Sequence, residues 1–317
     1  KSSINKHFWY GFLSTATFRQ SEKYTYSGGL DYRNYKGEHY QEVYNLLGAD
    51  YAINSDDPNS DAAVKRVGDK IFKHNIGLVQ WGGMFGQMEY KTALWSGFIN
   101  ISGAVSGFKK IDYFLPKIIS GTGKTVGYGF DGVEPIPDST IVDGILYTPD
   151  SDGLEFQESE WKTIGGFTVK GGANYNLTER MNAFINLGYL SRAPRFANVF
   201  DRYSTNLLVE IENELIQAIE LGYSYRWKKF ASNLNGYYTN WNNKPVNERV
   251  TKQFPDGERT VNINGMDAIH MGVEIDFAYK LSQKLTFEGV FSLGQWTWES
   301  KKDSITFEDE KGNIATE

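Results

Sequence analysis

Alternation between apolar and polar residues recurs along this chain over stretches longer than the five or six residues of an ordinary strand. Successive side chains of a β-strand point to opposite faces, so each such stretch has one apolar and one polar face. After residue 23 the apolar face reads Tyr24, Tyr26, Leu30 and Tyr32, and the residues between include Thr25, Ser27, Asp31 and Arg33. The pattern predicts long strands that each expose an apolar face.

This alternation predicts ten strands, and the stretch 76–91 alternates least clearly among them. The predicted ranges are 7–19, 23–36, 76–91, 94–109, 161–176, 181–191, 215–227, 230–242, 259–280 and 285–299. Ten long strands and no helical pattern place the chain in the all-β class, as an antiparallel sheet.

The connections between these strands fall into two length classes. Five are short, at 20–22, 92–93, 177–180, 228–229 and 282–284, and four are long, at 37–75, 110–160, 192–214 and 243–258. Short turns on one side and long loops on the other are typical of outer-membrane β-barrels. The fold predicted is therefore a transmembrane antiparallel β-barrel in a cell outer membrane.

Composition is compatible with a barrel, although the mean hydropathy of -0.47 resembles that of a soluble protein. A barrel strand exposes only every second residue to lipid, which lowers its average hydropathy. Aromatic residues reach 15%, as the aromatic girdles of a barrel would require. The longest uncharged run, Thr92–Phe108, contains Ser96 and Asn100 and is too short for a transmembrane helix. The net charge of -6 argues against a nucleic-acid partner.

The alternation assigns particular residues to the two faces. Leu221, Val273 and Ile275 are expected to face lipid, and Glu220 and Glu274 to face the lumen. A soluble β-sandwich or propeller is the alternative reading. It leaves unexplained why aromatic and aliphatic residues would gather on the outer face while Lys, Glu and Asp lie inside.

An ordered set of short motifs follows the sixth predicted strand. The set consists of Arg192-Ala193-Pro194, then Asn213-Glu214, then Glu220-Leu221-Gly222-Tyr223, and finally the stretch from Tyr237 to Trp241. This order resembles TonB-dependent transporters, and the resemblance is most specific over 189–241. The stretches 35–40, 46–48 and 81–87 are similar to a branch of that family whose members often carry an N-terminal carboxypeptidase-regulatory-like domain.

The resemblance implies that residues 1–317 form part of a larger barrel. The parent would have 22 strands around an N-terminal plug, and this chain supplies about ten of the strands. We expect the plug domain and strands at both ends to lie outside this chain.

The resemblance also implies active uptake of a scarce nutrient, such as a siderophore, cobalamin, a glycan or a peptide. TonB would supply the energy through the plug segment, lipid would surround the barrel, and a surface lipoprotein could be a further partner. No cofactor is implied. The alternatives are a passive porin or structural barrel and, less favoured, a barrel enzyme, for which no catalytic set stands out.

The motif residues also have physical roles that do not depend on the resemblance. Pro194 has no backbone N–H, so it is expected to mark the end of strand pairing. Arg192 and Glu220 are candidate ligand contacts in the lumen. A structural role is favoured for both, since a charge in the lumen wall must find a partner.

Segment 131–160 carries nine acidic residues and no Lys or Arg. We expect a solvated loop outside the cell, because blocks of like charge stay in water. Asp150 and Asp152 are weak candidates for a Ca²⁺ site, although the stretch covers only part of an EF-hand loop. The four histidines, His7, His39, His74 and His270, show no metal-ligand spacing in the sequence.

Overall fold

The protein is described by a computed structural model. It describes residues 1–316 apart from 131–133, 202–203, 209–210, 245–248, 255–256, 263–265, 300–305 and 309–313, and between 245 and 265 and after 299 it describes only the backbone of strands. No helix within the described ranges has both the length and the apolar character needed to span a bilayer.

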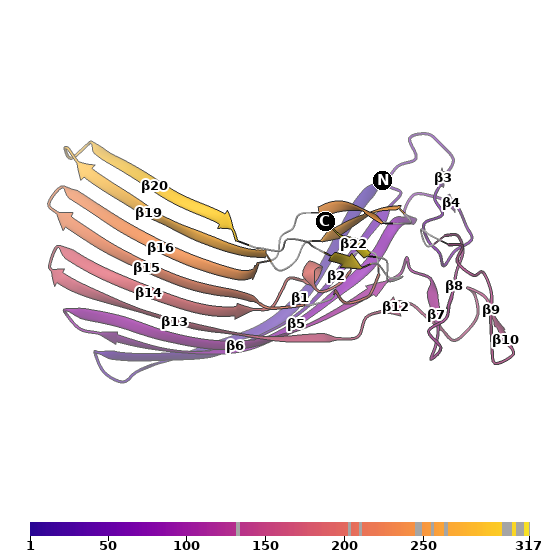
Figure 1. Ribbon diagram of the computed structural model, residues 1–317, viewed down its shortest axis with the longest axis horizontal. Helices are drawn as coiled ribbons and strands as arrows, with labels where there is room; N and C mark the ends of the chain where they lie inside the picture. Colours follow the sequence, from indigo (N-terminus) through magenta and orange to yellow (C-terminus); the bar gives the residue numbers. More distant parts are fainter. Residues whose placement is uncertain are drawn as a thin grey trace.

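Ten long antiparallel strands form one continuous curved sheet, shown in Figure 1. Each pairs with the next along the sheet, so the order is a simple meander from one edge to the other. Their bounds are β1 Ser2–Arg19, β2 Tyr24–Glu42, β5 Lys70–Lys91, β6 Trp95–Asp112, β13 Lys162–Thr178, β14 Met181–Arg192, β15 Glu214–Trp227, β16 Phe230–Lys244, β19 Met266–Lys280 and β20 Thr286–Trp298. With 12 to 22 residues, each is longer than the roughly 9–11 needed to cross a bilayer.

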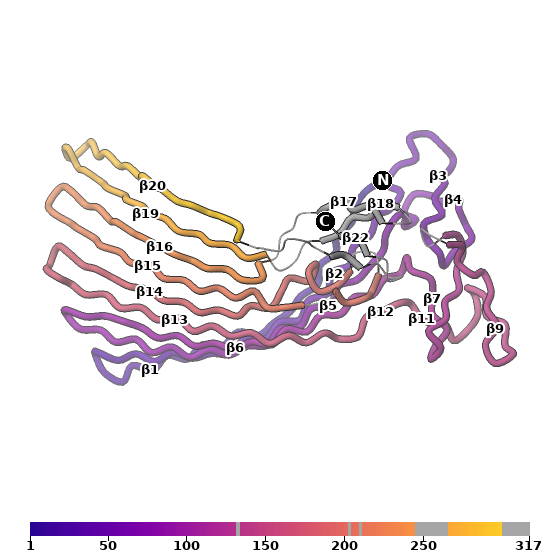
Figure 2. The backbone as a smooth tube through the Cα atoms, viewed as in Figure 1, coloured from indigo at the N-terminus to yellow at the C-terminus, as the bar shows by residue number. Residues whose placement is uncertain are grey.

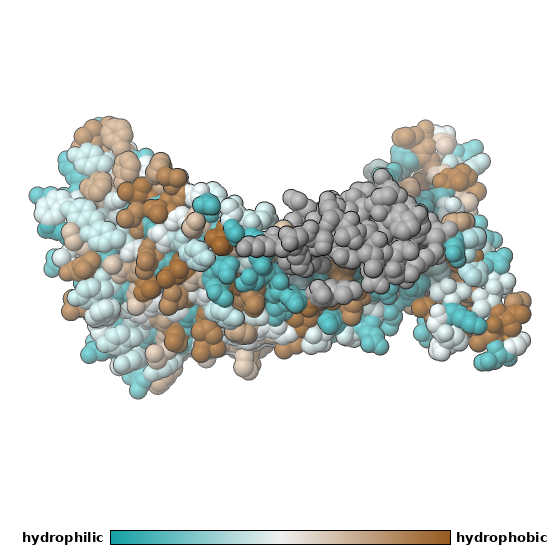
Figure 3. Space-filling model, in the orientation of Figure 1, coloured by the Kyte–Doolittle hydropathy of each residue, from teal (hydrophilic) through white to brown (hydrophobic). Residues whose placement is uncertain are grey.

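One face of the sheet is apolar, and the strand register shows that this face is continuous. A single row of paired residues crosses seven strands as Met88, Ile99, Gly171, Leu187, Ile219, Tyr238 and Met271. Leu221 is 54% exposed and Val273 51% exposed, as lipid-facing residues would be in the absence of lipid. Apolar residues are spread over β13 to β20 on the side seen in Figure 3.

The opposite face, which we call the polar wall, carries the residues between those apolar ones. One of its rows runs Phe98, Gly172, Asn186, Glu220 and Tyr237. Glu220 accepts a hydrogen bond from Asn186 Nδ2 at 3.1 Å, and Asp276 accepts one from Asn233 Nδ2 at 2.8 Å. Because a barrel exposes its apolar face to lipid, the polar wall is the interior side.

The two ends of the strands differ as the connection lengths predict. Tight turns join the strands at one end, and long loops gather at the other, as the trace in Figure 2 shows. The described parts of the loops contain the 3₁₀ helix η1 Phe196–Asn198 and small strands. These strands are β3 Ala52–Ile53, β4 Val64–Lys65, β7 Lys117–Ile119, β8 Thr125–Val126, β9 Thr140–Val142, β10 Ile145–Tyr147, β11 Leu154–Glu155, β12 Gln157–Glu158, β17 Arg249–Phe254, β18 Gly257–Asn262, β21 Thr306–Glu308 and β22 Ile314–Thr316.

All ten predicted strands are present, and several of their bounds are corrected. β2 ends at Glu42 and β5 begins at Lys70, so both strands extend into the predicted loop 37–75. The range 259–280 was predicted as one strand, but the sheet strand β19 begins at Met266, and β18 ends at Asn262 in a separate hairpin with β17. The range 76–91, where the alternation is weak, still pairs regularly with β6. The irregular part of β5 lies before this range, where the pairing with β2 shifts register after Tyr40 and Phe72 has a positive φ of 64°.

Candidate ligand-facing wall and its folded-in segment

The strands extend beyond the lipid at the long-loop end. Lys109 lies on the same face of β6 as the apolar residues Ile101 and Val105, and its Nζ forms an ion pair with Glu158 at 2.6 Å. Charged groups on the lipid-facing side are costly within the bilayer. The level of Lys109 therefore lies outside the membrane, and the polar wall at this level faces the mouth of the barrel.

The Arg-Ala-Pro motif marks the place where the chain leaves the sheet. The pairing of β14 with β15 ends at Arg192 opposite Glu214, two residues before Pro194. The two side chains form an ion pair, with Glu214 2% exposed and Arg192 52% exposed. This arrangement supports the structural role expected for Arg192. Glu220 lies on the same face of β15 as Glu214, closer to the middle of the strand, and it accepts a hydrogen bond from Asn186.

The remaining motif residues each have a local structural reason. Asn213 Nδ2 donates to Gly165 O and to Ser191 Oγ, both at 2.7 Å. These bonds attach the residue just before β15 to strands β13 and β14. Gly222 faces the ring of Phe184, which occupies the space that a Cβ at this position would need. Leu221 points to the apolar face, and Ala193 is half-buried between Arg192 and Pro194.

The chain that follows the motif folds back onto the polar wall. We call the described residues of 193–211, which exclude 202–203 and 209–210, the folded-in segment. Its Val199 and Phe200 are buried against Phe108 of β6, and Val79, Ile164 and Phe196 pack around them. Phe108 pairs with Val79, on the polar-wall side of β5 and β6. The segment thus covers the wall at the mouth of the barrel, and its apolar residues hold it there.

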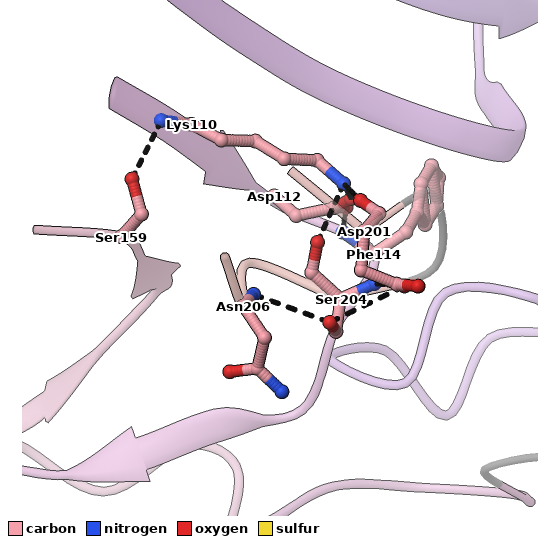
Figure 4. A network of polar contacts seen from close by, with 7 residues as sticks. All are labelled: Lys110, Asp112, Phe114, Ser159, Asp201, Ser204 and Asn206. Carbon is pink, nitrogen blue, oxygen red and sulfur yellow. Dashed lines mark hydrogen bonds and ion pairs between the residues drawn. The ribbon is translucent and has the colours of Figure 1, made fainter. Parts of the chain in front are cut away.

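A buried lysine of the wall fastens this segment, as Figure 4 shows. Lys110 Nζ donates to the backbone oxygens of Ser204 at 2.7 Å and Asp201 at 3.1 Å, and lies 3.7 Å from Asp112 Oδ2. Within the segment, Ser204 donates its backbone N–H to Asp201 Oδ1 at 3.0 Å. A cation that hydrogen-bonds two main-chain oxygens fixes the segment without depending on its side-chain sequence.

Burial also affects the protonation of this pair at the mouth of the barrel. It lowers the pKa of Lys110 and raises the pKa of Asp112, since desolvation disfavours both charges. Their mutual attraction opposes both shifts. No motif in the sequence predicted the contacts of Lys110 with the folded-in segment. The sequence shows only two consecutive lysines at the end of a predicted strand, and in the structure one of them faces outward and the other inward.

The acidic segment and the Ca²⁺ candidates lie at the far end of the long loops. Every acidic residue that the structure describes between 134 and 160 is exposed, while Asp131 lies outside the described residues. Asp150 and Asp152 flank a turn before β11. Among the described residues, no group of three or more His, Cys, Asp or Glu side chains could hold a metal ion. The Ca²⁺ site remains a prediction.

Fold and site together define a section of an outer-membrane barrel wall with a folded-in segment at its mouth. The chain belongs to the family described as TonB dependent receptor-like, beta-barrel, whose family model matches residues 2–316. No curated protein sequence matches the chain significantly.

Solved structures of TonB-dependent receptors share the fold. They include the copper transporter OprC, with 13% identity over 92% of this chain and 39% of that chain, at a TM-score of 0.57. The ferric-catecholate import receptor Fiu of E. coli K12 has 15% identity over 95% and 39%, at 0.55. The ferric yersiniabactin receptor FyuA of Yersinia pestis has 8% identity over 94% and 37%, at 0.53. The chain spans about two fifths of the length of these proteins.

Proposed function

We propose that this chain forms part of the barrel of an outer-membrane active transporter for a scarce nutrient, energised through TonB. The substrate classes are those of a siderophore, cobalamin, a glycan or a peptide. The observation that carries the proposal is the family match over 2–316, together with an unbroken meander of ten strands. The family consists of transporters, so no catalytic role is proposed.

The missing parts of the transporter belong to the same proposal. Residues 1–317 would be a partial barrel, with a plug domain and further strands outside this chain. TonB would act through a segment of that plug, and a surface lipoprotein could cover the mouth. The polar wall fits this arrangement, because hydrogen-bonding side chains such as Asn186 and Glu220 line the side that would surround a plug.

The need for energy follows from the geometry of a plugged lumen. A bulky solute cannot pass a plug and a folded-in segment without displacing them. The outer membrane offers no nucleotide or ion gradient of its own to supply that work.

The test measures uptake of the ligand, once identified, by cells that carry the whole gene, with and without TonB. Uptake should depend on TonB and on the proton motive force, while binding of the ligand to the cell surface should persist without TonB. Equal uptake in the TonB-deficient cells would overturn the proposal and favour a passive porin.

A further inference from the structure

Two histidines that are far apart in the sequence meet on the polar wall. His7 of β1 pairs with Gly37 of β2, and His39 lies two residues further on, on the same face of β2. The centroids of the two imidazole rings are 5.7 Å apart, and the ring planes are inclined by 69°. The site lies at the mouth of the barrel, because the same row continues through Gly77 to Lys110.

Tyr35 and His39 lie directly over Gly37. A Cβ atom at this position would lie 2.9 Å from His39 Nε2 and 2.5 Å from Tyr35 Oη, closer than non-bonded atoms tolerate. His7 Nδ1 is hydrogen-bonded to the same Tyr35 Oη at 2.6 Å. One imidazole and one phenol therefore lie over Gly37, and the second imidazole joins them through its hydrogen bond to Tyr35 Oη.

The Nδ1 atom of His39 has a hydrogen-bond acceptor beside it, as the second nitrogen of a metal-binding histidine usually does. His39 Nδ1 lies 2.6 Å from Asn5 Oδ1. An amide oxygen can only accept, so Nδ1 carries the hydrogen and Nε2 keeps its lone pair directed at the space over Gly37. A histidine ligand of a metal typically donates its other N–H to an oxygen in this way, which fixes the tautomer and the ring orientation.

The ring separation is close to what a shared ion would impose. A metal–nitrogen bond of about 2.0–2.1 Å places the ion roughly 3.2 Å from each ring centroid. Two such ligands have centroids about 4.5 Å apart at the right angle that Cu²⁺ prefers, and about 5.2 Å apart at a tetrahedral angle. The observed 5.7 Å is longer than both, so the rings would have to approach by about 0.5–1.2 Å when the ion binds.

We propose that His7 and His39, with Tyr35 beside them, bind a divalent transition-metal ion at the mouth of the barrel, with Cu²⁺ bound most tightly. Imidazole nitrogen suits Cu²⁺, Ni²⁺ and Zn²⁺, and the Irving–Williams order places Cu²⁺ first. The hard cations Ca²⁺ and Mg²⁺ prefer carboxylate oxygen, which this cluster does not supply. With two protein nitrogens the ion keeps open positions for water, so it can exchange. The proposal goes beyond the transporter function, and it can be tested without TonB.

The experiment measures Cu²⁺ binding to the purified, detergent-solubilised full-length receptor by calorimetry and by electron paramagnetic resonance. The wild-type spectrum should show hyperfine structure from two nitrogens. His7→Ala and His39→Ala should each weaken binding by at least about tenfold and leave one nitrogen. His270→Ala is the matched control, because His270 also lies on the polar wall, on β19, and should bind no part of the ion.

Two further variants separate metal binding from folding. Gly37→Ala keeps both histidines but displaces Tyr35 Oη and His39 Nε2 from their positions over this residue, so binding should fall while the thermal transition stays near that of the wild type. Asn5→Leu should weaken binding through the orientation of His39. Equal Cu²⁺ affinity in His7→Ala, His39→Ala and His270→Ala would overturn the proposal. So would a spectrum of the copper-bound wild type that lacks hyperfine structure from nitrogen.

Discussion

The guanidinium of Arg192 forms an ion pair with the carboxylate of Glu214, which lies directly opposite it on the neighbouring strand. Glu214 is almost fully buried, and Arg192 is half-exposed. Replacing Arg192 with Met leaves a buried carboxylate without its cation. We expect the full barrel to lose about 3 kcal/mol of unfolding free energy, measured by denaturant titration in detergent.

A double variant separates the ion pair from the burial of Glu214. Arg192→Met with Glu214→Met should recover most of the loss, because two apolar side chains can replace a buried pair of charges at little cost. If both single variants and the double variant unfold like the wild type, the ion pair has no structural role. Arg192 would then become a stronger candidate for direct ligand contact.

The register of β19 predicts unequal effects at two neighbouring positions. Val273 faces the apolar side and Glu274 the polar wall, where Ser292 donates to Glu274 at 3.2 Å. Val273→Arg near mid-membrane should cost about 2–4 kcal/mol, and Glu274→Arg should cost clearly less. The measurement is reversible unfolding of the complete barrel in lipid. Equal costs would show that the assigned faces are wrong.

The position of the acidic segment predicts which end of the barrel a protease can reach. A glutamyl endopeptidase added to intact cells should cut at Glu155, which is exposed in the long-loop end. A lysine-specific protease should leave the turn at Lys228-Lys229 uncut until the cells are lysed, since this turn lies at the opposite end. The reverse pattern of protection would invert the topology.

Lys110 is predicted to control the stability of the folded-in segment. Lys110→Met removes the donors to Ser204 O and Asp201 O, and each bond from a charged donor contributes roughly 1.5–3 kcal/mol. Amide hydrogen exchange in 193–211 should rise, with little change in the sheet. Lys109→Met is the matched control, since its exposed ion pair with Glu158 contributes at most about 1 kcal/mol. Equal exchange in the two variants would count against the tether.

Much of the sheet could be predicted, because alternation with period two is a local property of the sequence. All ten long strands overlap the ranges that the pattern predicted, but several bounds differ. β2 continues to Glu42 instead of ending at 36, β5 begins at Lys70 instead of 76, and β19 begins at Met266 instead of 259. The error at β19 has a physical reason, since the hairpin of β17 and β18 alternates like the strand that follows. The face assignments of Leu221 and Glu220 also agree with the register.

The site could be predicted only where a residue in a motif directly determines the backbone hydrogen bonding. Pro194 marks the end of pairing because it lacks an N–H, which is visible in the sequence. The contacts of Lys110 with Asp201 and Ser204 join residues more than 90 positions apart, and nothing local encodes them. The meeting of His7 with His39 likewise depends on the register of two strands.

The continuous pairing of the strands determines where mechanical work can be absorbed. The register of β1 with β2 holds from Ser2 to Arg19, so bending the sheet would strain many bonds at once. The folded-in segment is attached by a small apolar cluster and by Lys110. A pull transmitted to the barrel would therefore leave the sheet nearly rigid and detach this softer element first. The force at which it yields would be adjustable by substitution at Phe108 or Lys110 alone.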